Sequence, residues 1–169
     1  FWGTRAHSTH ESCPSGTPRI ASVISQLNSE IFVNIQGDEP LITSELVDQV
    51  VETMEANDSD VVTPVYRITT VNELLNPNIT KAVRDPDGRA LYFSRSPIPY
   101  VRDSKTEDWL STTEFWGHVG VYCYQRNVLQ QYFELPGGKL ESAEKLEQLR
   151  LLEAGKLILP VETDHRPQG

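Results

Sequence analysis

Two carboxylates follow directly after an apolar run in the stretch IFVNIQGDEP, residues 31–40. The run is short and rich in β-branched residues, which is typical of a buried strand in a parallel sheet. Gly37–Pro40 is expected to form the loop at the carboxyl end of that strand, where open α/β sheets bind ligands. Asp38 and Glu39 would supply the oxygen ligands that Mg²⁺ prefers, and Mg²⁺ usually accompanies phosphates. The stretch alone is equally consistent with a strand that ends in a solvated acidic turn.

A second group of chemically useful side chains occupies residues 117–124. Strand alternation places His118, Gly120, Tyr122 and Tyr124 on one face and the apolar residues between them on the other. A glycine between a histidine and a tyrosine leaves room for a ligand to approach the strand. A packed core histidine is the ordinary alternative for His118.

The elements that must position these residues follow from hydrophobic periodicity. Helices are expected over residues 18–27, 44–56, 127–133 and 140–154, and strands over 31–36, 60–65, 79–84, 90–94, 117–124 and 157–161. Asp85–Gly88 indicates a hairpin turn, and 97–114 is expected to be a long polar loop. Strands that alternate with helices, together with one hairpin, predict an α/β fold with a mixed sheet.

Composition excludes several classes of protein. The chain has 169 residues and a formal net charge of −9. This length suffices for one domain with a substantial core. The acidic balance argues against nucleic acid as a partner, because no basic surplus can neutralise phosphates.

No stretch approaches the roughly 20 apolar residues of a membrane span, so no membrane association is expected. Cys13 and Cys123 form no disulfide framework and are expected to be reduced, in a cytoplasmic protein.

Six motifs in register resemble one family. They are Ser15-Gly16-Thr17-x-Arg19, Asn34-x-Gln36-Gly37-Asp38-Glu39-Pro40, Asn76-Pro77-Asn78-x-x-Lys81, Leu91-Tyr92-Phe93-Ser94-Arg95-x-x-Ile98-Pro99-Tyr100, His118-x-Gly120-x-Tyr122-x-Tyr124 and Leu146-Glu147-Gln148-Leu149-Arg150. Over about residues 15–169 the chain resembles the 3-deoxy-manno-octulosonate (Kdo) cytidylyltransferases, the CMP-Kdo synthetases of lipopolysaccharide precursor synthesis.

The resemblance implies a Rossmann-like nucleotidyltransferase with a mixed, mostly parallel sheet and a β-hairpin that serves dimerisation and sugar binding. It implies transfer of CMP from CTP to the anomeric hydroxyl of Kdo or its 8-amino analogue, with release of pyrophosphate. Mg²⁺ is the expected cofactor, because it offsets phosphate charge and aligns the nucleophile. The expected partners are CTP, an eight-carbon sugar acid and a second copy of the chain.

The resemblance also implies roles for individual residues. Asp38 is the expected metal ligand, and Asp38 and Gln36 are the expected catalytic residues. The sugar acid is expected to contact polar and charged side chains from several elements: Gln36, Arg95, Arg102, His118, Tyr122, Glu147 and Gln148. Arginine suits a carboxylate because its guanidinium can donate two parallel hydrogen bonds. The nucleotide is expected near Ser15, Gly16 and Arg19, although an ordinary helix start at these residues would attract an anion as well.

The chain departs from the family pattern at both ends. We expect residues 1–14 to be irregular and poorly ordered, and residues 15–169 to form a partial cytidylyltransferase domain. The family's N-terminal strand with its phosphate loop has no counterpart here, and neither does the segment with a second metal-binding aspartate. Two alternatives therefore stay open: a related synthetase of the acylneuraminate type, or a catalytically inactive fragment that retains sugar binding and assembly.

Overall fold

The computed structural model describes residues 7–11, 13, 16–37, 39 and 41–167. Its strands are β1 (Ile31–Ile35), β2 (Val61–Arg67), β3 (Lys81–Arg84), β4 (Ala90–Ser94), β5 (Trp116–His118), β6 (Val121–Gln125) and β7 (Ile158–Glu162). Its α-helices are α1 (Gly16–Val23), α2 (Ser44–Ala56), α3 (Val71–Leu75), α4 (Trp109–Thr112), α5 (Arg126–Gln131), α6 (Lys139–Glu144) and α7 (Gln148–Glu153). Short 3₁₀ turns cover Ile24–Gln26, Thr106–Asp108 and Tyr132–Glu134. The α/β class predicted from the sequence is confirmed.

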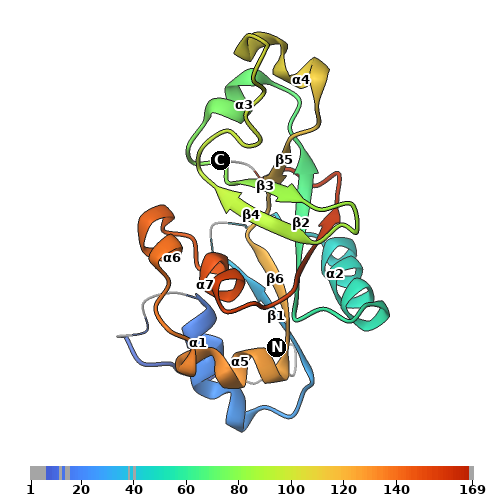
Figure 1. Ribbon diagram of the computed structural model, residues 1–169. Helices are drawn as coiled ribbons and strands as arrows, with labels where there is room; N and C mark the ends of the chain where they lie inside the picture. The colour runs from blue at the N-terminus through green and yellow to red at the C-terminus, as the bar shows by residue number, and fades with distance from the viewer. Residues whose placement is uncertain (1–6, 12, 14–15, 38, 40, 168–169) are drawn as a thin grey trace.

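The described strands form one sheet in the order β1-β6-β2-β5-β3-β4, with β7 also paired to β2 (Figure 1). The expectation of mostly parallel pairing is wrong for these strands, because β2–β7 is their one parallel pair. The helical crossover from β1 to β2 does make these two strands run in the same direction. However, β6 lies between them and is antiparallel to both. Periodicity cannot reveal this insertion, since β6 is far from both strands in the sequence.

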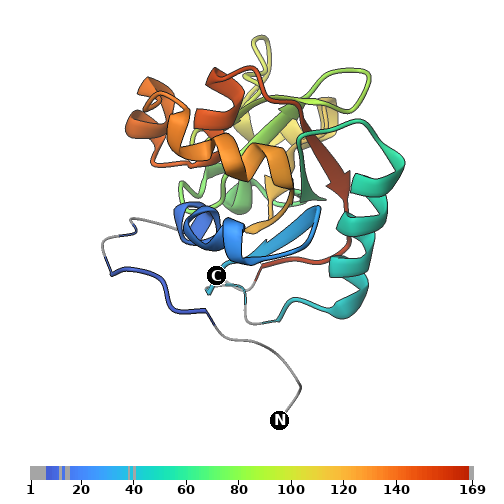
Figure 2. The same cartoon turned by 90° about the horizontal axis from the view of Figure 1, so that it is seen from below.

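Helices cover both faces of the sheet. On one face, α1, α5 and α7 pack on Val61, Tyr122 and Tyr124, and on the opposite face α2 packs on Val62, Val121 and Cys123 (Figure 2). Every residue of β2 from Val61 to Tyr66 is buried, as expected for a central strand that is covered on both sides. Two apolar cores therefore lie between the sheet and its helices, one on each face.

Two predicted elements are each split in two. Residues 117–124 form not one strand but β5 and β6, separated at Val119–Gly120, where the Val121 N–H donates to the carbonyl of Val119 at 2.7 Å. Residues 140–154 form not one helix but α6 and α7, because Lys145 adopts a left-handed conformation with φ 55°. Left-handed backbone stops a helix, and a lysine there gives no sequence signal of the stop. Both breaks lie next to predicted site residues.

The hairpin between β3 and β4 is present, and its strands pair antiparallel. Its turn is closed by the Asp85 N–H, which donates to the Arg89 carbonyl at 2.9 Å, and by the Gly88 N–H, which donates to the Asp85 carbonyl at 3.0 Å. Gly88 has φ +85°, which favours glycine at this position.

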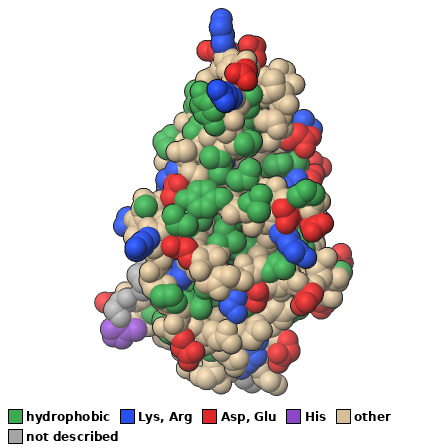
Figure 3. All heavy atoms as spheres, viewed as in Figure 1, with side chains coloured by type: hydrophobic (Ala, Val, Ile, Leu, Met, Phe, Trp, Pro, Cys, Tyr) green, Lys and Arg blue, Asp and Glu red, His purple; other side chains and the backbone are tan. Residues whose placement is uncertain are grey.

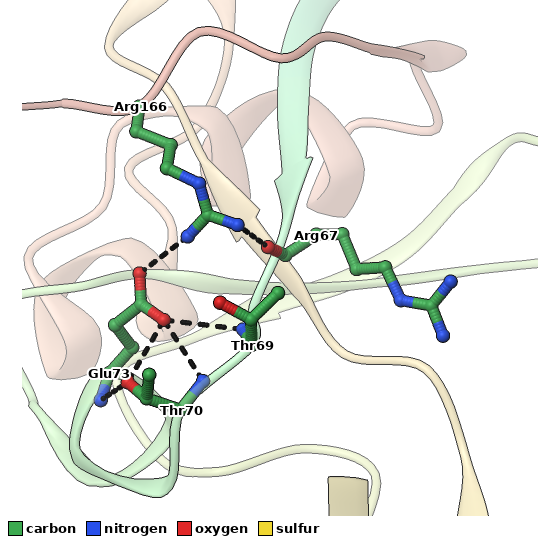
Figure 4. Close-up of polar contacts among 5 residues, drawn as sticks. All are labelled: Arg67, Thr69, Thr70, Glu73 and Arg166. Atoms are coloured by element: carbon green, nitrogen blue, oxygen red, sulfur yellow. Dashed lines mark hydrogen bonds and ion pairs between the residues drawn. The ribbon is translucent and has the colours of Figure 1, made fainter. Parts of the chain in front are cut away.

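The segment after β7 is fastened to the start of α3 (Figure 4). Arg166 pairs with the Glu73 carboxylate at 2.9 Å and donates to the Arg67 carbonyl at 2.8 Å. Glu73 also completes a capping box with Thr70. These contacts hold residues 163–167 against the end of β2. None of the helices in the described part of the chain is long and apolar enough to cross a membrane.

Candidate active site

Polar side chains gather on the sheet face that α1 and α7 cover. They come from five elements and are called here the polar row: Asn34, Thr63, His118, Tyr122, Tyr124 and Gln148. Asn34 of β1 is the register partner of Tyr122 in β6, so the two side chains lie on the same face. The rings of His118 and Tyr122 lie 5.2 Å apart, and those of Tyr122 and Tyr124 are stacked at 5.8 Å. The predicted His118/Tyr122 face is therefore formed, despite the break between β5 and β6.

His118 is held in one tautomer by Thr63. The Thr63 hydroxyl donates to the Val121 carbonyl at 2.7 Å, and it lies 2.8 Å from His118 Nε2. Because the single hydroxyl proton goes to Val121, the hydroxyl must accept from Nε2–H, which leaves Nδ1 as the ring acceptor. Burial lowers the pKa of His118 to about 3, so the ring is neutral at physiological pH.

The lowered pKa of His118 predicts a loss of stability in acid. In the unfolded chain the group titrates near 6.5, so between pH 6.5 and about 3 the unfolded state binds more protons than the folded state. As the pH is lowered through this range, the free energy of unfolding should decrease, by at most about 1.4 kcal/mol per pH unit from this group. Urea unfolding of the wild type and of His118→Gln between pH 7 and 4 measures the effect. The wild type should lose stability more steeply, and parallel curves would contradict the assignment.

Gln148 and Asn34 carry amide groups with unused donors. The Tyr122 hydroxyl donates to Gln148 Oε1 at 3.1 Å, whereas Gln148 Nε2 and Asn34 Nδ2 are buried without a hydrogen-bond partner. Gln148 is 2% exposed and Asn34 is 7% exposed. Buried donors are nearly always satisfied, so two unused amides in one row indicate a place where a polar ligand binds. Sequence reasoning did not single out Asn34 or Thr63 as functional, although a polar residue inside an apolar strand was a usable signal for each.

Glu147 contacts α1 rather than the polar row. Its Oε2 accepts from the Thr17 N–H at 3.3 Å, and the Thr17 hydroxyl lies 2.9 Å from the Tyr124 hydroxyl. Gly16 lies so close to Asn34 that an added Cβ would come within 3.0 Å of its Nδ2. Glu147 and Gln148 therefore connect the start of α1, where the nucleotide is predicted, to the face where the sugar is predicted.

The space over Gly120 is occupied by the chain itself. The side chains of Gln36 and Glu39 would lie 3.1 and 3.3 Å from a Cβ on Gly120, and Glu39 Oε1 accepts from the Gly120 N–H at 3.1 Å. The expectation that Gly120 leaves room for a ligand is therefore wrong, because these two side chains fill that room. Asp38 lies outside the described residues. Gln36 and Glu39, which precede and follow Asp38 in the sequence, lie next to the break between β5 and β6.

The two predicted arginines differ in their surroundings. Arg95 donates from Nε to the Glu144 carbonyl at 2.8 Å and from Nη1 to the Pro77 carbonyl at 3.1 Å. Phe93, two residues earlier, contacts the His118 ring at 5.3 Å, so Arg95 follows a strand that reaches the polar row. Arg102 is 91% exposed, 4.0 Å from the carboxylate of Asp103, and the structure does not bring it to the row.

The predicted nucleotide residues are described in part. Ser15 lies outside the described residues. Arg19 is exposed, and it donates to the Thr9 hydroxyl at 2.9 Å and to the Cys13 carbonyl at 3.3 Å, which fastens the preceding segment to α1. In the described part of residues 1–14, which is 7–11 and 13, there is no helix or strand.

Metal ligands are sparse in the described residues, which contain no group of three His, Cys, Asp or Glu side chains placed to hold an ion. Gln36 and Glu39, on either side of Asp38 in the sequence, carry oxygen atoms of the type that binds Mg²⁺. Mg²⁺ often takes only one or two carboxylates together with substrate phosphates.

A separate groove of about 780 Å³ opens between the start of α2 and residues 162–166. Its lining mixes both signs of charge, so it favours no single class of ligand.

Sequence comparison identifies relatives along the whole chain. A family model described as cytidylyltransferase matches residues 2–158. The 3-deoxy-manno-octulosonate cytidylyltransferase of Geotalea uraniireducens (strain Rf4) is 45% identical over 175 residues, which cover 99% of this chain and 69% of the relative. The enzyme of the same name from Geobacter sulfurreducens is 42% identical and is covered to 70% of its length.

Structural comparison agrees with the sequence relatives. A solved structure of CMP:2-keto-3-deoxy-manno-octonic acid synthetase complexed with CTP superposes with a TM-score of 0.86 at 38% identity, over 95% of this chain and 64% of that one. A glucose-1-phosphate thymidylyltransferase from Bacillus anthracis superposes with a TM-score of 0.57 at 12% identity, which indicates a shared fold alone.

Proposed function

Because this chain belongs to the cytidylyltransferase family, we propose that it transfers CMP from CTP to the anomeric hydroxyl of Kdo or its 8-amino analogue. In this reaction the hydroxyl oxygen bonds to the α-phosphorus of CTP and loses its proton. The bond from the α-phosphorus to the oxygen that bridges to the β-phosphate breaks, and pyrophosphate leaves. The product would serve lipopolysaccharide precursor synthesis, and we place the reaction in the cytoplasm, where CTP is made.

The observation that carries the proposal is the polar row with its two unused amide donors. A sugar acid presents many hydroxyl groups, each of which can both donate and accept. Gln148 Nε2 can donate to such a hydroxyl, and neutral His118 can accept through Nδ1. The Tyr122 hydroxyl orients the Gln148 amide by donating to its oxygen. Binding would thus satisfy the amide donor of Gln148 that the free protein leaves unpaired.

The sugar carboxylate is assigned to Arg95. The charges of Arg95 and Glu144 both act on the Lys81 ammonium, and the Glu144 carboxylate accepts from the backbone N–H of Arg95 at 3.0 Å. These three residues together carry a net charge of +1. An anionic substrate group beside Arg95 would balance that charge. Arg102 is assigned to the sugar acid on the resemblance alone.

We assign the nucleotide to the start of α1 and the metal to Asp38. Ser15, Gly16 and Arg19 would contact CTP, and Asp38 would share Mg²⁺ with its phosphates. When bound, Mg²⁺ would offset phosphate charge at the α-phosphorus. Gln36 would contribute its side-chain amide at the same loop, and Glu39 would hold the loop through the Gly120 N–H.

A panel of acceptor sugars tests the function. Pyrophosphate release from CTP is measured with the full-length protein and Kdo, its 8-amino analogue or an acylneuraminate. Release with an eight-carbon acid and little with acylneuraminate supports the proposal. The reverse preference would make the protein an acylneuraminate-type synthetase. Binding of the sugar acid without release of pyrophosphate from any combination would indicate a non-catalytic binding protein.

We also propose that the protein forms a homodimer through residues 89–101. Leu91 is 61% exposed and Tyr100 is 76% exposed. Apolar side chains gather on the face of the molecule where the hairpin of β3 and β4 lies (Figures 1 and 3). Exposed apolar patches of this kind often mark protein interfaces. Residues 117–124 are also rich in apolar side chains, but they do not share this surface, because Val119 and Val121 are fully buried in the core.

Light scattering checks the dimer. The folded full-length protein should show one discrete dimer mass at micromolar concentration, and Leu91→Glu should shift it toward the monomer. Leu140→Glu, on exposed residue Leu140 of α6, is the matched control and should leave the mass unchanged. A monomeric wild type would rule out this interface.

A further inference from the structure

A fully buried lysine fastens the loop before β3. Lys81 has no solvent-exposed surface, and its ammonium donates to the carbonyls of Asn76, at 2.9 Å, and Ile79. Burial, and to a smaller extent the nearby Arg95, lower the pKa of Lys81 to about 8, so the group is still mainly charged at neutral pH. A buried ammonium is costly unless its donors are used. Lys81 therefore fixes the conformation of loop 76–79.

Arg95 holds the same loop from the other side. Its Nη1 donates to the Pro77 carbonyl at 3.1 Å, between the two carbonyls that Lys81 engages. Its Nε donates to the Glu144 carbonyl at 2.8 Å. The orientation of the Arg95 guanidinium thus depends on where loop 76–79 lies, and Lys81 determines that position.

Glu144 closes the cluster at the end of α6. Its carboxylate accepts from the Ser94 hydroxyl at 2.6 Å and from the backbone N–H of Arg95 at 3.0 Å. Ser94 is also the register partner of Lys81 across the β3–β4 pair. The first residue of β3, the end of β4 and the end of α6 are therefore held together by one set of hydrogen bonds.

In the sequence, Glu144 of this cluster of Lys81, Arg95 and Glu144 comes just before residues of the proposed sugar site. The left-handed residue Lys145 follows Glu144, and α7 begins at Gln148. Glu147 then contacts the Thr17 N–H and Gln148 contacts the Tyr122 hydroxyl. A shift of the end of α6 would move both side chains, because only a few residues of chain separate them from Glu144.

We propose that Lys81 is a positioning residue for the sugar acid, which acts by holding loop 76–79, Arg95 and the corner 144–148 in the binding arrangement. This inference rests on the proposed function. It assigns a role to the Asn76-Pro77-Asn78-x-x-Lys81 motif, which is linked to the polar row through the backbone, because the Thr80 carbonyl accepts from the His118 N–H at 2.8 Å. A merely structural lysine would lower stability without distinguishing between the two substrates.

A double-mutant cycle in the full-length protein tests the inference. The variants are Lys81→Met, Arg95→Ala and the double variant, with Lys139→Met on exposed residue Lys139 as the control. Lys81→Met should raise the KM for the sugar acid about 10-fold and change the KM for CTP less than about 2-fold. In the Arg95→Ala background the added effect of Lys81→Met should largely disappear, since contacts within one network are not additive. Additive effects, or equal changes in both KM values, would overturn the proposal.

Hydrogen exchange provides a readout that does not require activity. Lys81→Met should speed amide exchange at residues 145–149, to which the Lys81 ammonium donates no described hydrogen bond, whereas Lys139→Met should not. Unchanged amide exchange at these residues would overturn the inference, whether or not the enzyme makes a CMP-sugar. A wild type without activity would count only against the proposed function. If Lys81→Met does not fold, Lys81→Gln, which keeps a neutral NH₂ donor group, should show the same effects at a smaller size.

Discussion

Asp38→Asn should reduce turnover of CTP by about 100-fold or more, because the substitution removes a carboxylate that we assign to Mg²⁺ at the α-phosphorus. Mg²⁺ prefers charged oxygen ligands, and an amide in place of the carboxylate weakens its attraction. Initial rates of pyrophosphate release, measured over a range of Mg²⁺ concentrations, give the loss directly. Part of the lost rate should return at high Mg²⁺, since the defect lies in metal binding.

Asp87→Asn is the matched control for this change. Asp87 is an exposed carboxylate in the turn between β3 and β4, so its substitution should leave turnover within about 2-fold of the wild type. Near-normal activity of a folded Asp38→Asn protein would contradict the metal assignment. A loss that Mg²⁺ does not relieve at any concentration would indicate another role for the loop.

Gln148→Met should lower kcat/KM for the sugar acid by about 10- to 100-fold, which corresponds to the loss of one or two buried hydrogen bonds. The substitution keeps the length of the side chain and removes the amide whose nitrogen is unpaired in the free protein. The KM for CTP should change little. Gln130→Met, on an exposed position of α5, should have no effect on either substrate.

Stability measurements separate binding from folding in this variant. Gln148→Met leaves the Tyr122 hydroxyl without its amide acceptor, so the midpoint of thermal unfolding should fall modestly. Tyr122→Phe combined with Gln148→Met removes both partners and should restore most of the loss, since removing both members of a buried pair is often nearly neutral. A double variant that binds the sugar acid normally would contradict the role of the polar row.

Local periodicity predicted the elements well and the sheet less well. The helix at Ser44–Ala56, which Thr43 caps in the structure, and the Asp85–Gly88 hairpin were predicted because their signals lie within a few residues. The pairing of β6 between β1 and β2 was not predictable, since it joins segments about 60 to 90 residues apart. The left-handed Lys145 that ends α6 also gave no local signal.

Sequence reasoning predicted three members of the polar row but not the contacts within it. His118, Tyr122 and Gln148 come together as expected, because the face of a strand can be read from alternation. Glu147 turned out to contact Thr17, and Gln36 and Glu39 turned out to fill the space over Gly120. These outcomes depend on side-chain packing between distant segments. The buried Lys81 is a similar case, since a charged residue at the start of a strand usually indicates a surface position.

The most direct test follows the label of α-³²P-CTP in the full-length protein with Kdo and Mg²⁺. We predict that the label moves into one new product, the CMP ester of the sugar acid, and that unlabelled pyrophosphate appears in equal amount. Omission of the sugar acid should abolish both. Label that stays in CTP while the folded protein is saturated with both substrates, or that appears as free CMP independently of the sugar acid, would contradict cytidylyl transfer as the function of this protein.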